Sequence, residues 1–424
     1  MGAARGNEIR FGAREMAGAV ADIGVLLPIA VTLIVSNGLS ATAVLLPAGL
    51  LYVAVAFAFA LPIPVQPLKA FGAIAIAKDL GSDEIAAGAL VMGVVFIVLG
   101  RTGLIDLAAR AFPKPLIRGV QIAVGLLFLK IAWELVADPP AAFDDRGLGV
   151  VAATAMALLA LAALVALRRV AAALALVVLG TVLMLARSGG GIELGPSALA
   201  LPDLDADVLL TALTVLVIPQ LPLTFANSCL ATADAARTYF AERAAHVTPG
   251  RLATSLGSAN LLAGALSGMP VCHGAGGLTA HHAFGARTGG APLVMGGGLV
   301  MVALAAGSGL AVVLAAFPLP ILAALLAAAG VLHLGLARDL DGPGAWAVAL
   351  LVASLGFGLN LAVGLAAGLA AVWGPRLLGR RGTTLDSWRR TRNRRPTRGP
   401  TEPPSSESSE ATPAASPTSR SSES

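Results

Sequence analysis

Apolar blocks recur along this chain from Glu15 to Pro375, and they limit its fold more than any other feature. Each block is about 20 residues long, which is the length that an α-helix needs to cross the hydrocarbon core of a bilayer. Only 12% of the residues are charged, about half the fraction found in soluble globular proteins. The first block follows a basic head and is succeeded at once by further blocks, which argues against a cleavable signal peptide. The sequence therefore predicts an all-α polytopic membrane protein.

The blocks predict about fourteen transmembrane segments in two sets of seven. The first set lies near residues 17–36, 42–61, 65–78, 86–104, 118–136, 148–167 and 169–187. The second set lies near residues 208–231, 248–268, 270–283, 291–311, 313–336, 344–358 and 359–377. Four regions follow from them: an N-terminus at 1–16, a first repeat at 17–187, a second repeat at 208–377 and a tail at 378–424.

The distribution of charge supports this count, because basic residues fall in every second loop. Cytoplasmic loops carry an excess of Lys and Arg, and the N-terminus contains Arg5, Arg10 and Arg14. The loops expected on the same side contain Arg101, Arg110, Lys114, Arg118, Arg168, Arg169, Arg237, Arg243, Arg251, Arg287 and Arg338. The other loops are acidic or uncharged, apart from Arg146. Both termini are therefore predicted to be cytoplasmic, in a multi-pass protein of the cell membrane.

The net charge of +5 does not indicate a nucleic-acid partner, because most of it lies in the tail. Residues 379–424 hold nine Arg against one Asp and four Glu. A basic cluster after the last segment is typical of a topology signal that contacts lipid headgroups. Beyond Arg398 the tail is rich in Ser, Pro, Glu and Thr, so we expect it to be disordered.

The two cysteines, Cys229 and Cys272, are too few for a disulfide framework or a four-cysteine zinc site. His273, His281 and His282 are badly spaced for a zinc site, which needs three or four ligands. We therefore expect no metal and no cofactor. His281 and His282 fall at the end of segment 270–283, where we expect them to be interfacial.

A weak internal repeat relates the two halves of the chain. "DIGVLLP" (22–28) precedes "PIPVQPLKAFGAIAIA" (62–77), and "VIPQLPLTFANS" (217–228) precedes "GMPVCHGAGGLTAHHA" (268–283). The Pro-Val pairs at 64–65 and 270–271 correspond at an offset of 206. Seven segments in each half would place the halves in opposite orientations, as an inverted repeat. Short segments interrupted by Gly and Pro at matching places in two such halves indicate a substrate site near the bilayer midplane.

Prolines explain why the segments at 65–78 and 270–283 are short. Pro62, Pro64 and Pro67 cannot lie in a continuous helix, since each lacks a backbone donor and clashes with the preceding turn. A half-helix can therefore start only after Pro67, and by the same argument after Pro270. Its first N–H groups are free and its positive dipole end is exposed. Two such ends meeting at the midplane would form an anion cradle, whereas the alternative is a Pro-kinked helix without a ligand.

The candidate substrate-binding residues lie at these starts and on one neighbouring segment. At the half-helix starts they are Gln66, Lys69, Cys272, His273 and Gly274, and on one polar face of segment 208–231 they are Gln220, Thr224 and Asn227. We expect Gly274 to let the anion approach backbone N–H groups, and Gly277 to pack against a neighbouring helix. Two alternatives stay open: Cys272 as a small buried hydrophobe, and the polar face as contact between helices.

Asp22 is the candidate coupling residue. A carboxylate within a transmembrane segment is costly and indicates a functional site by default. It would carry a proton or pair with Lys69, one of only four lysines in the chain.

Several of these stretches resemble the molybdate transporter family, which is related to sulfate permeases. They are "PIPVQPLK" (62–69), "PQLPLT" (219–224), and "MPVCHGAGGL" (269–278) followed by "FGARTG" (284–289). The resemblance covers about residues 11–377 and implies the seven-plus-seven inverted-repeat fold, with a core domain that moves against a gate domain. It also implies a carrier for molybdate, with sulfate as a competing substrate. The sequence Ala-Asp-Ile-Gly at 21–24 departs from the family's usual Gly-Asp-Leu-Gly but keeps the Asp.

The sequence thus predicts a secondary active transporter that imports a tetrahedral oxyanion, with molybdate as the first candidate. No ATP-binding motif is visible, so we expect coupling to an ion gradient or exchange, with symport of a proton as the first choice. Membrane lipid is the other expected partner, and a homodimer is left open. The alternatives are a sulfate or nucleobase carrier of the same fold and, from another class, an intramembrane Cys-His enzyme with Cys272 as its nucleophile.

Overall fold

The structure is a computed structural model that describes residues 9–105, 112–143, 149–167, 170–188 and 193–377. The chain divides into a compact unit, 1–374, and a second unit, 375–424, of which only the end of one helix is described. The predicted tail at 378–424 and the first eight residues lie outside the described part of the chain.

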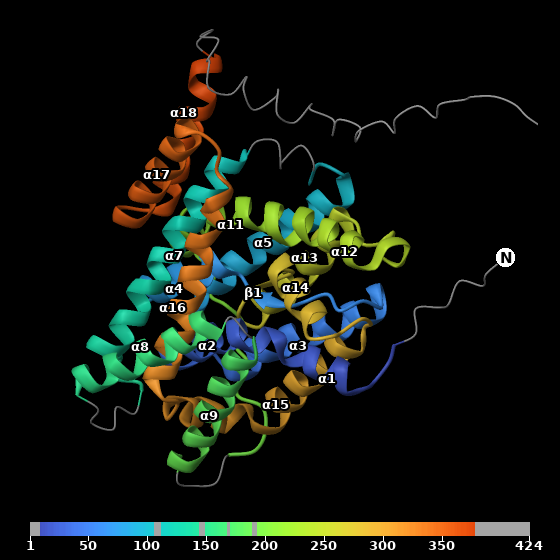
Figure 1. Ribbon diagram of the computed structural model, residues 1–424, viewed down its shortest axis with the longest axis vertical. Coiled ribbons are helices and arrows are strands. Elements are labelled where there is room, and N and C mark those ends of the chain that lie inside the picture. The colour runs from blue at the N-terminus through green and yellow to red at the C-terminus, as the bar shows by residue number, and fades with distance from the viewer. Residues whose placement is uncertain (1–8, 106–111, 144–148, 168–169, 189–192, 378–424) are drawn as a thin grey trace, which may run out of the picture. The chain divides into compact units, whose positions relative to one another are not determined.

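The first half is built from helices that follow the predicted segments (Figure 1). Its elements are α1 (Ala13–Ala19), the 3-10 turn η1 (Val20–Asp22), α2 (Ile23–Val35), α3 (Ala41–Phe59), α4 (Lys69–Ala77), α5 (Ser82–Thr102), α7 (Lys114–Ala137), α8 (Val150–Leu167) and α9 (Val170–Arg187). The N-terminal run from α1 through η1 to α2 is continuous and carries Asp22 at its middle turn.

The second half repeats this order of long and short helices. Its elements are α10 (Ala206–Thr211), η2 (Ala212–Val217), α11 (Ile218–Leu223), η3 (Thr224–Ala231), α12 (Thr232–Phe240), η4 (Ala241–Ala244), α13 (Pro249–Ala265), α14 (Ala275–Ala283), α15 (Gly290–Ala315), α16 (Leu319–Gly335), η5 (Leu336–Asp339), α17 (Pro343–Gly358) and α18 (Leu361–Leu377). The segment predicted at 208–231 runs on to Phe240. In the described chain, seven helical runs are long and apolar enough to cross a membrane, and four shorter helices are also apolar.

Two π-helical stretches, η2 and η3, interrupt the run from α10 to α12 on either side of Pro219 and Pro222. A proline has no N–H to donate and its ring crowds the preceding turn, so the regular hydrogen-bond ladder cannot pass through it unchanged. π-helical turns inside longer helices occur frequently at functional sites. Here η3 carries two of the predicted site residues, Thr224 and Asn227.

Two strands of two residues each bring the halves of the chain together. β1 (Gln66–Pro67) pairs with β2 (Val271–Cys272) in antiparallel register, with Gln66 opposite Cys272 and Pro67 opposite Val271. The N–H of Leu68 extends the pairing by donating to the carbonyl of Pro270 at 3.2 Å. Helix α4 begins directly after β1, as the prolines predict.

The second short helix begins later than we expected. We placed Cys272 and His273 at its start, but Cys272 is extended in β2 and α14 begins only at Ala275, with Gly274 as its N-cap. The reason is the strand pairing, which holds residues 271 and 272 in an extended conformation before the chain can coil.

Helices from the two halves pack together in two groups. In one group α5 packs along α13 and α3 along α15, and in the other α7 packs along α16 and α17. Figure 1 shows α7 and α16 side by side. Small residues allow the backbones to approach closely, as at many helix contacts in membranes. A Cβ on Gly296 of α15 would lie 2.7 Å from the carbonyl oxygen of Gly49 in α3, and one on Gly330 would lie 2.7 Å from that of Gly125. Helix α4, which also contacts α2 and α11, packs against α7 of the second group.

Candidate functional site

The carboxylate of Asp22 lies buried at the centre of a polar cluster, with 1% of its surface exposed. Its Oδ2 accepts hydrogen bonds from the hydroxyl of Tyr52 at 2.7 Å and from Nε2 of His281 at 2.8 Å. Its Oδ1 accepts a bond from Nε2 of Gln66 at 2.5 Å. Three donors around one carboxyl group match the acceptor capacity of an ionised acid. The surrounding structure therefore stabilises a negative charge at this position.

Gln66 links this carboxylate to Lys69. While its amide nitrogen donates to Asp22, its Oε1 accepts a bond from the ammonium of Lys69 at 2.6 Å. Lys69 is half-buried in the first turn of α4. The direct pair between Asp22 and Lys69, which was one of our two expectations for Asp22, is therefore wrong. The basic partner of Asp22 is His281, and Lys69 reaches it only through Gln66.

The structure also corrects our prediction that His281 is interfacial. Its side chain is fully buried, because α14 turns the face that carries Gly277 and His281 toward Asp22. The Nδ1 atom of His281 is buried without a hydrogen-bond partner among the described residues. Gly277 likewise faces the site and not a neighbouring helix, since a Cβ there would lie 2.6 Å from both Asp22 Oδ1 and Gln66 Nε2.

The polar face of the helical run 206–240 is only partly open to a ligand. Gln220 is buried and its Oε1 accepts from the N–H of Phe71, one of the first N–H groups of α4, at 2.9 Å. Its amide nitrogen donates to Thr224 Oγ1 at 2.9 Å. Gln220 and Thr224 therefore join α11 and η3 to α4. Asn227 is half-buried, and its Nδ2 lies 3.6 Å from the position of a Cβ on Gly274.

Cys272 and His273 make bonds to backbone and side chains of the same site. The thiol of Cys272 lies 3.8 Å from the carbonyl oxygen of Pro67, within β1. His273 is fully buried, with Nδ1 donating to the carbonyl of Pro64 at 2.9 Å and Nε2 lying 2.8 Å from Ser255 Oγ. Both ring nitrogens thus bond groups other than the thiol, and the two side chains do not form a nucleophile–base pair.

Sequence reasoning missed Tyr52 and misplaced His281. A signal for His281 was available, because Gly277 and His281 are four residues apart and such residues share a helix face. No pattern in the apolar segment at 42–61 distinguishes Tyr52 from an ordinary buried aromatic residue. Within the described ranges, no group of three or more His, Cys, Asp or Glu residues could hold a metal ion.

Comparison with known proteins then identifies the family. The family model described as "Molybdate transporter of MFS superfamily" matches residues 14–128 and 212–332, together more than half of the chain. The chain belongs to the molybdate transporter family. The matched ranges contain all nine predicted substrate-binding and coupling residues. The family named from the sequence motifs is therefore confirmed, and as a member of a family of transporters the chain is not an enzyme.

Plant and algal relatives match over most of their length. Molybdate transporter 1 of Arabidopsis thaliana is 28% identical over 389 residues, covering 82% of this chain and 85% of the relative. Molybdate transporter 2 of the same plant is 28% identical, covering 75% of this chain and 77% of the relative. Molybdate transporter 1 of Chlamydomonas reinhardtii is also 28% identical, with coverage of 80% and 86%.

Solved structures with similar folds are transporters as well. The transmembrane domain of the cyanobacterial bicarbonate transporter BicA superposes with a TM-score of 0.57 and 19% identity, covering 84% of this chain and 96% of that domain. The murine anion transporter Slc26a9, in an inward-facing state, gives a TM-score of 0.63 and 14% identity, with coverage of 87% and 69%. This molybdate transporter family member therefore has the helical, polytopic membrane fold of these anion transporters.

Proposed function

We propose that the protein is a secondary active transporter that imports molybdate across the cell membrane by alternating access. The observation that carries this proposal is the pairing of β1 with β2, which brings the beginnings of α4 and α14 to one place beside Lys69. The names of the relatives, all molybdate transporters, supply the substrate. Sulfate, which has the same tetrahedral shape and charge, is the competing candidate.

The anion would be held between the two short helices. The first N–H groups of an α-helix have no carbonyl partner within that helix, and the helix dipole makes this end attractive to anions. Lys69 supplies a full positive charge in the first turn of α4, and Gly274 of the other half lies between Gln66 and Asn227. In this arrangement Gln66, Lys69, Asn227 and Gly274 would contact the anion. Gln220, Thr224, Cys272 and His273 would hold the backbone that surrounds it.

The strand register supports the proposed inverted repeat. Residues that correspond between the halves at the offset of 206 include Gln66 and Cys272, and these two residues lie opposite each other in the antiparallel pair. Two equivalent residues can face each other in this way when a two-fold axis passes between them. Such an axis in the membrane plane is typical of transporters with inverted-topology repeats.

We place the proton of the proposed symport on the pair formed by Asp22 and His281. His281 donates from Nε2 to the carboxylate, while its buried Nδ1 has no partner among the described residues and could accept a proton. Gln66 would couple this pair to the substrate, since the same amide bonds Asp22 on one side and Lys69 on the other. An anion that drew Lys69 away from Gln66 would therefore change the hydrogen bonding of Asp22.

The two packing groups of helices would supply the parts that alternating access requires. Helices α1–α5 and α10–α15 would form the core that carries the anion, and α7–α9 and α16–α18 the gate. Substrate access would alternate as one group rocks against the other around the site. Both termini would be cytoplasmic, because the basic loops predict that orientation.

Uptake of labelled molybdate into vesicles that contain the purified protein tests this proposal directly. We expect uptake that saturates, that an inward proton gradient accelerates, and that excess sulfate inhibits only partly. Equal inhibition by equal concentrations of unlabelled sulfate and molybdate would assign the protein to both oxyanions. Uptake of neither labelled anion above that of empty vesicles would contradict the proposal.

Lys69→Ala is expected to raise the apparent KM for molybdate by about ten- to hundredfold, because a charge-assisted hydrogen bond is worth about 1.5–3 kcal/mol. The amount of folded protein should stay near that of wild type, since Lys69 is half-buried and bonds only one side chain among the described residues. The measurement is uptake at varied molybdate concentration, with Lys78→Ala, at the other end of α4, as the matched control. A wild-type KM in the Lys69 variant would remove this side chain from the site.

Gly274→Ala is expected to weaken molybdate binding in a protein that still folds. A Cβ at the N-cap of α14 would lie 2.5 Å from Gln66 Oε1, so the amide that bonds Lys69 would have to move. We expect a loss of about tenfold in affinity, equivalent to one charge-assisted hydrogen bond. Gly298→Ala in α15 is the control, because a Cβ there would meet nothing within 4 Å. Unchanged affinity in the Gly274 variant would place the anion elsewhere.

A further inference from the structure

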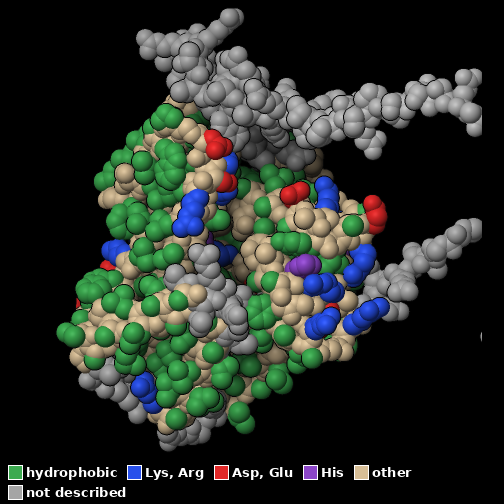
Figure 2. Space-filling model, viewed as in Figure 1, with side chains coloured by type: hydrophobic (Ala, Val, Ile, Leu, Met, Phe, Trp, Pro, Cys, Tyr) green, Lys and Arg blue, Asp and Glu red, His purple; other side chains and the backbone are tan. Residues whose placement is uncertain are grey.

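A second basic site lies outside the proposed transport site, where the N-terminal segment crosses the turn between α14 and α15. A cleft of about 900 Å³ opens there between residues 10–15, residues 283–288 and Arg243. Four arginines line it: Arg10, Arg14, Arg243 and Arg287. Figure 2 shows basic side chains gathered on this face, over the region of α1, α12 and α14 in Figure 1. We propose that this cleft binds a phosphate-type anion.

One acid lines the described part of the cleft, and its oxygens are already bonded. Among the described residues that line the cleft, four arginines stand beside this one glutamate, Glu15. Glu15 is buried, and its Oε1 accepts from the backbone N–H groups of Arg287 at 2.9 Å and Thr288 at 3.0 Å. Its Oε2 accepts from Ala291 at 3.2 Å, in the first turn of α15. Glu15 thus caps a helix, and the described residues that line the cleft include no other acid.

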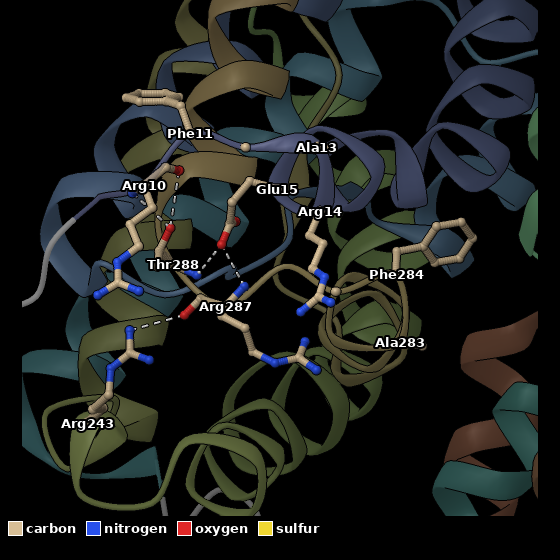
Figure 3. Close-up of a pocket in the computed structure, with 12 residues that line it drawn as sticks. Arg10, Phe11, Ala13, Arg14, Glu15, Arg243, Ala283, Phe284, Arg287 and Thr288 are labelled. Carbon is tan, nitrogen blue, oxygen red and sulfur yellow. Dashed lines mark hydrogen bonds between the residues drawn. The ribbon is translucent and has the colours of Figure 1, made fainter.

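The guanidinium groups of Arg14, Arg243 and Arg287 keep donors available for a ligand. Arg243 uses one nitrogen to donate to the carbonyl of Arg287 at 3.1 Å, and Arg287 donates from Nη1 to the carbonyls of His282 and Ala286. Each guanidinium has five N–H donors, so most of them remain. Arg14 is exposed, and its guanidinium makes no hydrogen bond or ion pair with the described residues. In Figure 3 the side chain of Arg10 points toward Arg243, and that of Arg14 toward Arg287.

Like charges that converge in this way repel one another unless an anion lies between them. A guanidinium presents its donors in a planar fork that matches two oxygens of a phosphate. A halide has no pair of oxygens, and a single carboxylate has only one pair, so neither can bond several arginines in this way at once. The fitting chemistry is therefore a tetrahedral phosphate with two or more free oxygens. It could come from the headgroup of an anionic lipid or from free phosphate in solution.

The position of the cleft gives such an anion a means of acting on transport. One wall, α1, continues through η1 to Asp22, and the other wall follows α14, which carries His281. Gly18 of α1 packs directly on Ala286 of the turn, and the N–H of Arg10 donates to Thr288 Oγ1 at 3.2 Å. An anion that bound both walls would hold Asp22 and His281 at their observed separation. Loss of the anion would free the two helices to separate. We therefore expect the anion to favour the arrangement in which His281 is hydrogen-bonded to Asp22.

The test uses the purified full chain with two probes. Inorganic phosphate is titrated in neutral detergent while the melting temperature is followed, and phosphatidylglycerol retention is measured by native mass spectrometry after passage through mixed phosphatidylcholine–phosphatidylglycerol vesicles. The double variant Arg14→Gln with Arg243→Gln removes two of the cleft charges. Arg101→Gln, an exposed arginine at the end of α5, is the matched control. Lys69→Ala reports on anion binding at the transport site.

We expect at least one probe to act on wild type and on both controls, and its half-effect concentration to rise about tenfold or more in the double variant. A response to free phosphate identifies a soluble anion, and selective retention of phosphatidylglycerol alone identifies a lipid headgroup. The proposal is overturned if neither probe acts on wild type or if the double variant responds like wild type. It is also overturned if Lys69→Ala alone abolishes the response, which would place the anion in the transport site. If the double variant does not fold, Arg14→Gln is tested alone, and the half-effect concentration of the probe is expected to rise in this variant too.

Discussion

Asp22→Asn is expected to abolish proton-driven accumulation of molybdate while exchange of preloaded molybdate remains measurable. Three donors end on this buried carboxylate, from Tyr52, Gln66 and His281. An amide in its place turns an N–H toward one of these donors and cannot carry the negative charge that stabilises a protonated histidine. Each charge-assisted bond is worth about 1.5–3 kcal/mol, so we expect at least a hundredfold loss of accumulation. The measurement is uptake of labelled molybdate under an imposed pH gradient.

Tyr52→Phe is the matched control for this variant. It removes one of the three donors but keeps the carboxylate, and it should lower accumulation by no more than about tenfold. Accumulation at the wild-type rate in Asp22→Asn would show that Asp22 does not carry the coupling. Removing one partner of a buried pair can destabilise a protein by about 3–5 kcal/mol. If Asp22→Asn therefore folds poorly, the double variant with His281→Gln restores a neutral pair. If the double variant folds but does not accumulate molybdate, the pair carries the proton. If it both folds and accumulates molybdate, the role of the pair is structural only.

The parts of the site that local chain chemistry determines were predictable from the sequence. Pro62, Pro64 and Pro67 forbid a helix before Lys69, so the extended lead-in and the start of α4 follow from the residues alone. The same prolines place Gln66 and Lys69 next to each other at that start, where the structure has them bonded. The corresponding lead-in at Pro270 was predicted less well, because pairing with β1 extends the chain past Cys272. Strand pairing between residues 206 apart is a long-range contact that no local rule contains.

The partners of Asp22 depend on tertiary packing, and the sequence did not predict them. Counting residues from Pro270 placed His281 at the end of its segment, near the membrane surface. How deeply His281 is buried depends instead on where α14 starts and on which helices α14 packs against. Lys69 was an attractive partner for Asp22 because charges in a membrane tend to pair. In the structure Gln66 stands between them. The role of Gln220 was equally hidden, since its bond to Phe71 exists only because α11 packs on α4.

Gly277→Ala is expected to disrupt the site, although it adds only one methyl group. That methyl would lie 2.6 Å from Asp22 Oδ1, 2.6 Å from Gln66 Nε2 and 2.7 Å from Pro64 Cβ. All three distances are shorter than normal contacts, and the hydrogen bond between Asp22 and Gln66 would have to break for the methyl to fit. Overpacking of this kind costs about 1–3 kcal/mol. We therefore expect a lower melting temperature and loss of nearly all molybdate uptake.

The neighbouring glycine provides a control that separates the site from helix propensity. Gly276 is the next residue in the first turn of α14 but is exposed, and a Cβ there would meet nothing within 4 Å. Ala is more favourable than Gly by about 0.8–1.0 kcal/mol in a helix interior and by less in the first turn, so Gly276→Ala should raise the melting temperature slightly and leave uptake near wild type. The same substitution at adjacent positions should thus change stability in opposite directions. If both variants were stabilised and both transported molybdate normally, α14 would not lie against Asp22 and Gln66, and the proposed coupling between substrate and proton would lose its structural basis.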